Sequence, residues 1–363
     1  METNELALLQ KTPLYETHVA LGAKMAPFGG WLMPIQYAGI LAEHAHTRSA
    51  VSVFDICHMG EFMLEGDPMS SGLDNIVTQN IISIPIGSCR YGFILGENAG
   101  VLDDLIIYRL KKNTWMIVVN AATISGDREH FIKHLSGDFR FKDVSGELGK
   151  LDVQGPRSQE AAVKIFGKGI ESLSYYTFSE FILWGERCIV SRTGYTGELG
   201  YEVYISNDYV VNLWELLLEN PLVKPAGLGS RDTLRLEMGY PLYGHELDVN
   251  HTPFTAGLEK FVDLSKDFIG KDVLLREKAD GLKEHLVYFK AESRRSPRNG
   301  FGIYEQNKRI GTVTSGSFSP SLSVGIGAGY ISGNYDIGNR LLVKDASVEI
   351  PVIITKKPFY NKV

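Results

Sequence analysis

Short apolar runs alternate with turn clusters along most of the chain. Between residues 88 and 120, the runs CRYGFIL, LIIYRL and WMIVVN are separated by the polar clusters GENAG and KKNT. Strand-length runs joined by Gly- and Asn-containing turns predict an antiparallel meander. Segments 36–50, 121–135 and 209–220 predict helices, and 149–167 predicts a strand, a Gly-Pro turn and a helix. This part of the sequence therefore indicates mixed helices and strands.

The pattern changes near residue 280. After the polar segment ADGLKEH, almost every apolar run is short and is bounded by Gly, Ser or Pro. This pattern of short apolar runs is typical of a small all-β barrel or sandwich. A chain of 363 residues is also too long for one ordinary core. We therefore expect the α+β class, with an α+β body over residues 1–280 and a C-terminal β domain over 281–363.

The composition, 44% hydrophobic and 22% charged, is that of a globular protein. A net charge of −6 argues against a general nucleic-acid binder, and no run is long and apolar enough to predict a membrane span. The first residues lack the pattern of a secretory signal. Cys57, Cys89 and Cys188 are odd in number and scattered, which fits a reduced compartment without disulfides. We expect a cytoplasmic protein.

Several common chemistries leave no motif in this sequence. We find no phosphate-binding G-x-x-x-x-G-K-[ST] loop, no Rossmann glycine spacing after a buried strand, no C-x-x-C pair and no G-x-S-x-G elbow. His44 and His46 are two residues apart, so on a helix they face different directions and do not predict a metal site. Hydrolase, kinase and dinucleotide-dependent dehydrogenase functions are therefore disfavoured.

Two adjacent aspartates stand at the start of an apolar run. If 101–110 is a strand, Asp104 shares a face with Ile106 and Tyr108, and Asp103 lies on the other face. For Asp103 we expect the common role of a turn residue. Asp104 has apolar and aromatic neighbours on its face, and partial desolvation there would raise its pKa toward a useful range. Asp104 is therefore a candidate functional carboxylate.

The stretch SRTGYTGELGYEVYI, residues 191–205, combines glycines with tyrosines and glutamates. Its glycines would let the backbone approach a flat ligand closely. Tyr195 could stack on such a ligand, and Glu202 could accept paired hydrogen bonds from a 2-aminopyrimidinone edge. The alternative is a glycine-rich hairpin with exposed glutamates.

Two further candidates also have ordinary interpretations. Met59 follows a predicted strand and suits either the wall of a heterocycle pocket or the core. Arg231, at the predicted start of a helix, could bind a ligand carboxylate. The more common role, and the one we expect from spacing alone, is a surface ion pair with a neighbour such as Asp232 or Glu237.

Nine motifs occur together and in order, at 28–37, 54–62, 100–110, 118–123, 154–160, 191–202, 225–247, 266–271 and 315–322. With these motifs the chain resembles the aminomethyltransferase of the glycine cleavage system, its T-protein, from about residue 11 to Tyr360.

The resemblance implies three domains arranged like a cloverleaf around a central tetrahydrofolate site, with a C-terminal all-β barrel. It implies transfer of a one-carbon unit from the aminomethyl-dihydrolipoyl arm of H-protein to tetrahydrofolate, giving 5,10-methylenetetrahydrofolate, ammonia and dihydrolipoyl H-protein. The other components of the system would be looser partners, and no metal, flavin or nucleotide is implied. The family's key carboxylate falls on Asp104. Its folate contacts fall on Met59, Tyr91, Tyr108, Asn120, Tyr195, Glu202 and Arg231.

The chain departs from this family at Glu259 and Lys260, where several relatives carry Ser-Trp, so the pocket wall there is expected to differ. Cys57 replaces a serine, which is a small change. The main alternative is a folate-dependent demethylase of a sulfonium or methylamine substrate, but such relatives tend to lack the paired aspartates. Related flavin-linked oxidases need a flavin domain, and related repair factors carry a K-G-C-type motif; the sequence contains neither.

Overall fold

The computed structural model describes residues 8–361, which divide into two compact units. The first unit contains the described residues up to Asp74, together with Ile81–Tyr91 and Leu105–Asp232; the second contains Asn75–Asn80, Gly92–Asp104 and the described residues from Thr233 onward. The chain passes between the units at five points, which lie within two strands, two helices and one loop, and not through a single linker. The division expected at residue 280 stays a prediction.

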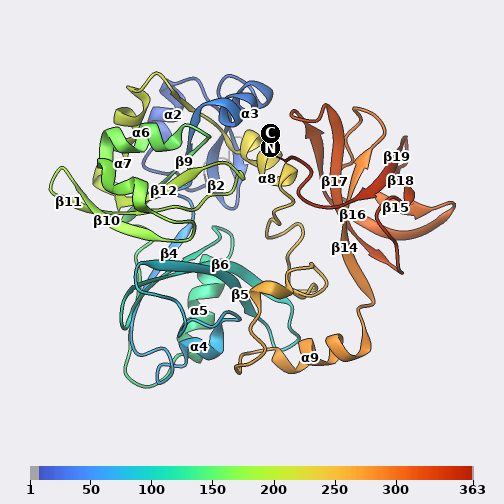
Figure 1. The fold of residues 1–363 in the computed structure, drawn as a ribbon, viewed down its shortest axis with the longest axis horizontal. Coiled ribbons are helices and arrows are strands. Elements are labelled where there is room, and N and C mark those ends of the chain that lie inside the picture. The colour runs from blue at the N-terminus through green and yellow to red at the C-terminus, as the bar shows by residue number, and fades with distance from the viewer. Residues whose placement is uncertain (1–7, 362–363) are drawn as a thin grey trace. The chain divides into compact units, whose positions relative to one another are not determined.

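A six-stranded sheet organises the first unit (Figure 1). In spatial order its strands are β10 (Phe178–Leu183), β11 (Glu186–Ser191), β12 (Gly200–Ser206), β9 (Leu148–Gln154), β3 (Val51–Asp55) and β13 (Val223–Pro225). All neighbours are antiparallel except β3 and β13. The strand, turn and helix predicted at 149–167 are confirmed as β9 and the helix α6 (Ser158–Phe166).

One face of this sheet is apolar and packs against α6 and α7 (Asn207–Leu218). Val153 and Val203 of the sheet lie in the same buried cluster as Trp214 of α7. Ser206 caps α7 by accepting a hydrogen bond from the backbone N–H of Asp208. The remaining elements before β3 are α2 (Tyr15–Ala20), the hairpin β1 (Lys24–Phe28) and β2 (Trp31–Gln36), and α3 (Ile40–Ser49); η1 (Lys168–Ser172) follows α6. The helices predicted at 36–50 and 209–220 are confirmed as α3 and α7.

A second, five-stranded sheet contains the meander predicted at 88–120, which is confirmed. Its order is β5 (Ser88–Leu95), β6 (Val101–Lys111), β7 (Thr114–Val119), β4 (Gly60–Glu65) and β8 (Arg140–Asp143). The helix predicted at 121–135 is confirmed as α5 (Ile124–His134). Phe131 of α5 packs against Phe62 and Phe141, so this helix covers one face of the sheet. The short helix α4 (Leu73–Ile76) follows β4.

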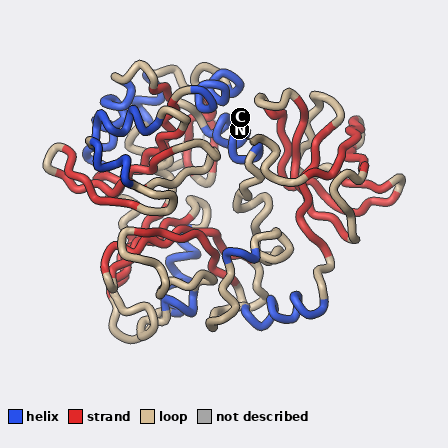
Figure 2. Tube along the Cα trace, viewed as in Figure 1, coloured by secondary structure: helices blue, strands red, loops and turns tan. Residues whose placement is uncertain are grey.

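In the second unit, the predicted C-terminal barrel is confirmed, and with it the α+β class. Six strands close on themselves in the order β14 (Glu284–Ala291), β17 (Val324–Ser332), β16 (Lys308–Ser319), β15 (Gly302–Glu305), β18 (Arg340–Asp345) and β19 (Val348–Thr355). Closure leaves no unpaired sheet edge. Phe289 and Val343 lie in its fully buried core. Figure 2 shows this strand-only region, which α9 (Lys271–Asp280) and η2 (Glu259–Phe261) precede.

A buried carboxylate ties the N-terminal segment to the six-stranded sheet. Asp55, at the end of β3, accepts hydrogen bonds from Thr12 Oγ1 at 2.6 Å, His18 Nε2 at 2.9 Å and the backbone N–H of Cys57 at 2.8 Å. Burial opposes ionisation of Asp55, but the hydrogen bond and charge of His18 lower its pKa overall. Asp55 therefore stabilises the first unit through contacts far apart in sequence.

We predict that Asp55→Ala lowers the free energy of unfolding by about 3–5 kcal/mol, because it leaves the buried donors of Thr12 and His18 without their acceptor. Urea unfolding of the full chain measures the difference. Glu129→Ala, at an exposed position on α5, is the control and should stay within about 0.5 kcal/mol. Equal unfolding midpoints for the Asp55 variant and the parent would contradict the assignment.

Candidate active site

The second face of the six-stranded sheet is polar although it is buried. Along β9, Lys150, Asp152 and Gln154 alternate with the apolar residues of the core face. Register places Glu202 of β12 opposite Asp152, and Tyr204 opposite Lys150. These five residues, here called the polar sheet face, are each no more than 4% exposed. Burying charge is costly unless it is paired or hydrogen-bonded, so this face demands specific partners.

Arg231, in the first turn of α8 (Leu228–Glu237), forms an ion pair with Asp152. Its guanidinium carbon also lies 5.0 Å from the centroid of the Tyr195 ring. Burial raises the pKa of Asp152 to about 6, the Arg231 charge opposes that rise, and Glu202 reinforces it. The expected surface ion pair of Arg231 with Asp232 or Glu237 is wrong: the partner is a buried residue of β9, which local spacing along the helix does not reveal.

Glu202 is held by a chain of hydroxyl groups. Thr193 Oγ1 donates to the Glu202 carboxylate, and Ser191 Oγ is hydrogen-bonded to Thr193 at 2.7 Å. The Tyr108 hydroxyl, which comes from β6, lies 3.1 Å from Ser191 Oγ and 3.0 Å from the Tyr204 hydroxyl. The alternative of an exposed glutamate is wrong for Glu202, which is 4% exposed. The network fixes the orientation of this carboxylate.

Lys150 and Glu61 complete the cluster, and sequence reasoning missed both, together with Asp152. Lys150 Nζ lies 3.5 Å from Glu202 Oε1 and donates to Met59 Sδ at 3.5 Å. Burial raises the pKa of Glu61 to about 8, while Lys150 opposes the rise. The sequence does contain a signal for Lys150 and Asp152: within a predicted strand, they and Gln154 occupy every second position, so their polar side chains lie on one face.

The two aspartates of β6 lie on opposite faces, as alternation predicts. Asp103 is fully buried within the strand, so its expected role as a turn residue is wrong. The strand begins at Val101, before both aspartates, because packing extends it beyond the apolar run LIIYRL. Asp104 is half-buried, on the same face of the strand as Ile106 and Tyr108. By its contacts, Asp104 belongs to the second unit.

The structure therefore joins some of the expected site residues to the polar sheet face by direct contacts. Met59, Tyr108, Tyr195, Glu202 and Arg231 are joined in the first unit by the contacts above. Tyr91 lies on β5 and Asn120 directly follows β7; both are half-buried residues of the first unit. Their role in binding stays a prediction.

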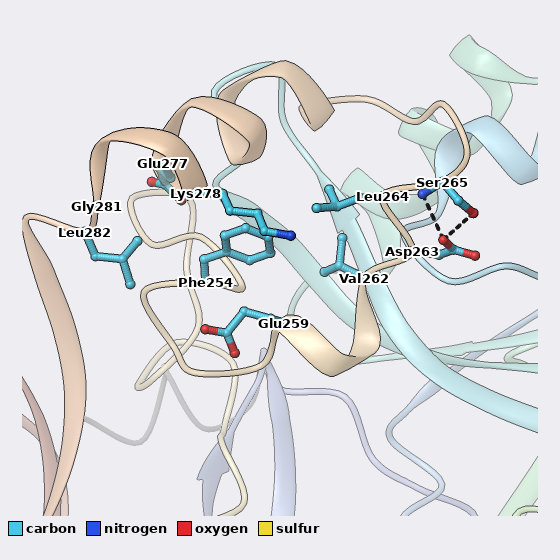
Figure 3. A pocket seen from close by; sticks show the side chains of 10 residues that line it. All are labelled: Phe254, Glu259, Val262, Asp263, Leu264, Ser265, Glu277, Lys278, Gly281 and Leu282. Carbon is cyan, nitrogen blue, oxygen red and sulfur yellow. Dashed lines mark hydrogen bonds between the residues drawn. The ribbon is translucent and has the colours of Figure 1, made fainter.

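A separate cavity of about 610 Å³ lies in the second unit (Figure 3). Figure 3 shows its wall, to which Glu277 and Lys278 of α9 and the segment around Phe254 contribute. Glu259, one of the two departures from the family pattern, lines this cavity, and the Lys260 ammonium lies 4.8 Å from the centroid of the Phe261 ring. The cavity is lined entirely by residues of the second unit and is distinct from the polar sheet face.

Three further observations bear on the sequence expectations. The three cysteines are free and buried, which confirms the prediction of no disulfide. Within residues 8–361, no group of three or more His, Cys, Asp or Glu side chains is placed to hold a metal ion. Over the same range, no helix has the length and apolar character needed to cross a membrane. Residues 1–7, where the lack of a secretory signal is expected, lie outside the described residues.

Comparison with known families gives two matches that together span most of the chain. Residues 14–266 match the family model described as the GCVT N-terminal domain. Residues 285–361 match the glycine cleavage T-protein C-terminal barrel domain, in agreement with the closed barrel of the structure.

Individual relatives match over nearly their full length. The chain is 40% identical to the aminomethyltransferase of Caldanaerobacter subterraneus subsp. tengcongensis, over 98% of this chain and 96% of the relative. It is 42% identical to that of Pseudothermotoga lettingae, over 97% and 98%. The crystal structure of glycine cleavage system aminomethyltransferase T from Bartonella henselae is similar, with a TM-score of 0.91 and 31% identity over 97% of this chain and 98% of that one.

We predict that stability falls with rising pH because of Glu61. The native state holds a proton on this carboxyl up to about pH 8, whereas the unfolded chain releases it near pH 4.5. The stabilisation is therefore complete below pH 4.5 and is lost as the pH rises to 8, by about 1.4 kcal/mol per pH unit. Glu61→Gln stays neutral, so its stability relative to the parent should rise by about 2–3 kcal/mol between pH 6 and 9.

Urea unfolding of parent and variant at both pH values measures this difference. Glu65→Gln, at an exposed position on the same strand, is the control and should show no such trend. A difference between Glu61→Gln and parent that is constant over the pH range would show that Glu61 holds no proton in the native state.

Proposed function

Since the chain belongs to the aminomethyltransferase family of the glycine cleavage system, we propose that its polar sheet face binds tetrahydrofolate and that Asp104 is the catalytic carboxylate. Family membership makes it a transferase enzyme. The observation that carries the binding proposal is the buried Glu202 carboxylate, fixed by Thr193 and flanked by Lys150. A buried acceptor beside a buried donor fits a flat, polar heterocycle better than an apolar one.

The reaction we propose transfers the methylene carbon of the aminomethyl group carried on the lipoyl arm of H-protein. The carbon–nitrogen bond to the amine and the carbon–sulfur bond to the arm both break. Tetrahydrofolate supplies two nitrogen nucleophiles that bond to the same carbon, and each loses one proton. One proton completes ammonia and the other completes the dihydrolipoyl thiol, so the atoms balance without an oxidant or a reductant.

Glu202 and Arg231 have separate tasks in this proposal. Glu202 accepts hydrogen bonds from the amino-pyrimidinone edge of the pterin, because it is a fixed and buried acceptor. Arg231, held by Asp152, presents a guanidinium beside the Tyr195 ring, an arrangement that suits stacking on a planar ligand. Met59 and Tyr108 line the same face, and Tyr91 and Asn120 are proposed as further contacts.

Asp104 is assigned the proton chemistry. Its carboxylate is half-buried in a strand whose other face lies in the core, so backbone and packing fix its position. A carboxylate so placed can orient the attacking nitrogen, stabilise the cation that develops on the one-carbon unit, and accept a proton. The paired aspartates also favour aminomethyl transfer over the alternative of a folate-dependent demethylase.

The partner in this proposal is lipoylated H-protein, with looser contacts to the other components of the system, and the location is the cytoplasm. The names of the relatives support the reaction class. Reconstitution tests the whole: the purified chain, aminomethylated lipoyl H-protein and tetrahydrofolate should yield ammonia and 5,10-methylenetetrahydrofolate. A methyl product, or turnover without H-protein, would favour the demethylase.

We predict that Asp104→Asn lowers turnover in this assay by a factor of about 10²–10⁴ and leaves tetrahydrofolate affinity largely intact, because the amide keeps the shape of the side chain but not its basicity. Single-turnover kinetics and a binding titration separate the two effects. Asp267→Asn, with a side chain 93% exposed, is the matched control and should leave both unchanged. Unchanged turnover in Asp104→Asn would remove the role assigned to this residue.

A further inference from the structure

Lys150 is a buried ammonium whose protein partners do not use its full donor capacity. Lysine is rarely fully buried unless it is paired, yet Lys150 is 1% exposed. Its ammonium lies 3.5 Å from a carboxylate oxygen of Glu202, 3.5 Å from the sulfur of Met59 and 4.9 Å from the centroid of the Tyr204 ring. An ammonium has three N–H donors, and a thioether is a weak acceptor. The group therefore retains capacity for a stronger acceptor.

A buried carboxyl oxygen of Glu61, which interacts electrostatically with Lys150, is not satisfied either. Glu61 Oε1 is buried and has no hydrogen-bond partner among residues 8–361. Lys150 and Glu202 are both among the charges that act on Glu61. Because an unsatisfied buried polar atom costs free energy, the unpartnered Glu61 Oε1 and the weakly bonded Lys150 ammonium together indicate a binding site and not ordinary core packing.

The arrangement of donor and acceptor indicates which ligand edge fits. Lys150 offers a donor next to the acceptor of Glu202, with 3.5 Å between the two atoms. The edge of a 2-amino-4-oxo-pyrimidine carries, in order, a carbonyl oxygen, a ring N–H and an amino group. Its complement is one donor followed by an acceptor that can take two hydrogen bonds, and a carboxylate is such an acceptor.

We propose that Lys150 is a specificity-determining residue that donates to the 4-oxo oxygen of the pterin while Glu202 accepts from the ring N–H and the 2-amino group. This inference rests on the proposed folate-binding function and deepens it. It assigns Lys150 a contact with the ligand, and not merely the neutralisation of Glu202.

The two roles of Lys150 differ in what they predict for a 4-amino analogue. In a 2,4-diaminopterin, the carbonyl acceptor is replaced by an amino donor, which would face the Lys150 ammonium donor to donor. The neutral ring N3 also loses the hydrogen that Glu202 would accept, so only the change in preference on removing Lys150 reports the role of Lys150. A site built to hydrogen-bond one group rejects an analogue that lacks it far more strongly than a hydrophobic pocket does. If Lys150 only neutralised Glu202, its removal would weaken both ligands by the same factor.

The test compares tetrahydrofolate with its 4-amino counterpart, tetrahydroaminopterin, by anaerobic calorimetric titration of the full chain. We expect the parent to prefer the 4-oxo ligand by about 100-fold or more. Lys150→Met should reduce this preference by about tenfold or more, chiefly by weakening the 4-oxo ligand, because one charge-assisted hydrogen bond is lost. Lys150→Gln, which keeps an N–H donor, should restore part of the preference.

Lys142→Met is the matched control. Lys142 also pairs with a glutamate, Glu147, but its side chain is 64% exposed, so its loss should leave the preference unchanged. Urea unfolding establishes that each variant is folded. If Lys150→Met does not fold, Lys150→Gln decides the matter: its preference should fall below that of the parent, and an unchanged preference would overturn the inference.

The outcomes separate this inference from the function on which it rests. A parent chain that binds neither ligand overturns the folate proposal and the inference together. A parent that binds both ligands equally, or a Lys150→Met variant that weakens both by the same factor, overturns the inference alone and leaves Lys150 a structural counter-charge of Glu202.

Discussion

The arrangement of the first unit depends on the pairing of buried charges on one face of its six-stranded sheet, because a buried charge without a partner costs much free energy. Because strand side chains alternate, β9 cannot place Leu151 and Val153 in the apolar core without turning Lys150 and Asp152 to the opposite face. Those charges require partners, which β12 supplies as Glu202 and α8 supplies as Arg231. The placement of both elements is therefore tied to two residues of one strand.

Hydroxyl groups extend this constraint to the second sheet. Tyr108 comes from β6, yet its hydroxyl bonds to Ser191 and Tyr204 of the six-stranded sheet. Both partners are more than 80 positions away in sequence, so this contact forms only when the two sheets have packed. Because Ser191 leads through Thr193 to Glu202, the orientation of the carboxylate depends on the packing of the sheets as well as on its own strand.

The sequence predicts local periodicity well and distant partners poorly. The alternation of side chains along β6 places Asp103 and Asp104 on opposite faces. The short apolar runs bounded by Gly, Ser or Pro after residue 280 predict the barrel. The turn expected at Asp103 fails because tertiary packing extends the strand past it. The partner of Arg231 is missed because Asp152 lies 79 residues away, whereas helix spacing suggests only neighbours such as Asp232. Lys150 is missed because the sequence does not show that both faces of β9 are buried, the polar face as well as the apolar one.

The charges of the polar sheet face also bear on what it can hold. Two cations, Lys150 and Arg231, stand against the carboxylates of Asp152 and Glu202. Glu61 adds no charge at neutral pH, because burial raises its pKa to about 8. Because its positive and negative charges balance, the polar sheet face attracts neither a free anion nor a free cation strongly. It does offer hydrogen-bond donors and acceptors in fixed positions. An uncharged heterocycle with a patterned edge exploits that arrangement best, since it forms hydrogen bonds without adding an unpaired charge to a buried site.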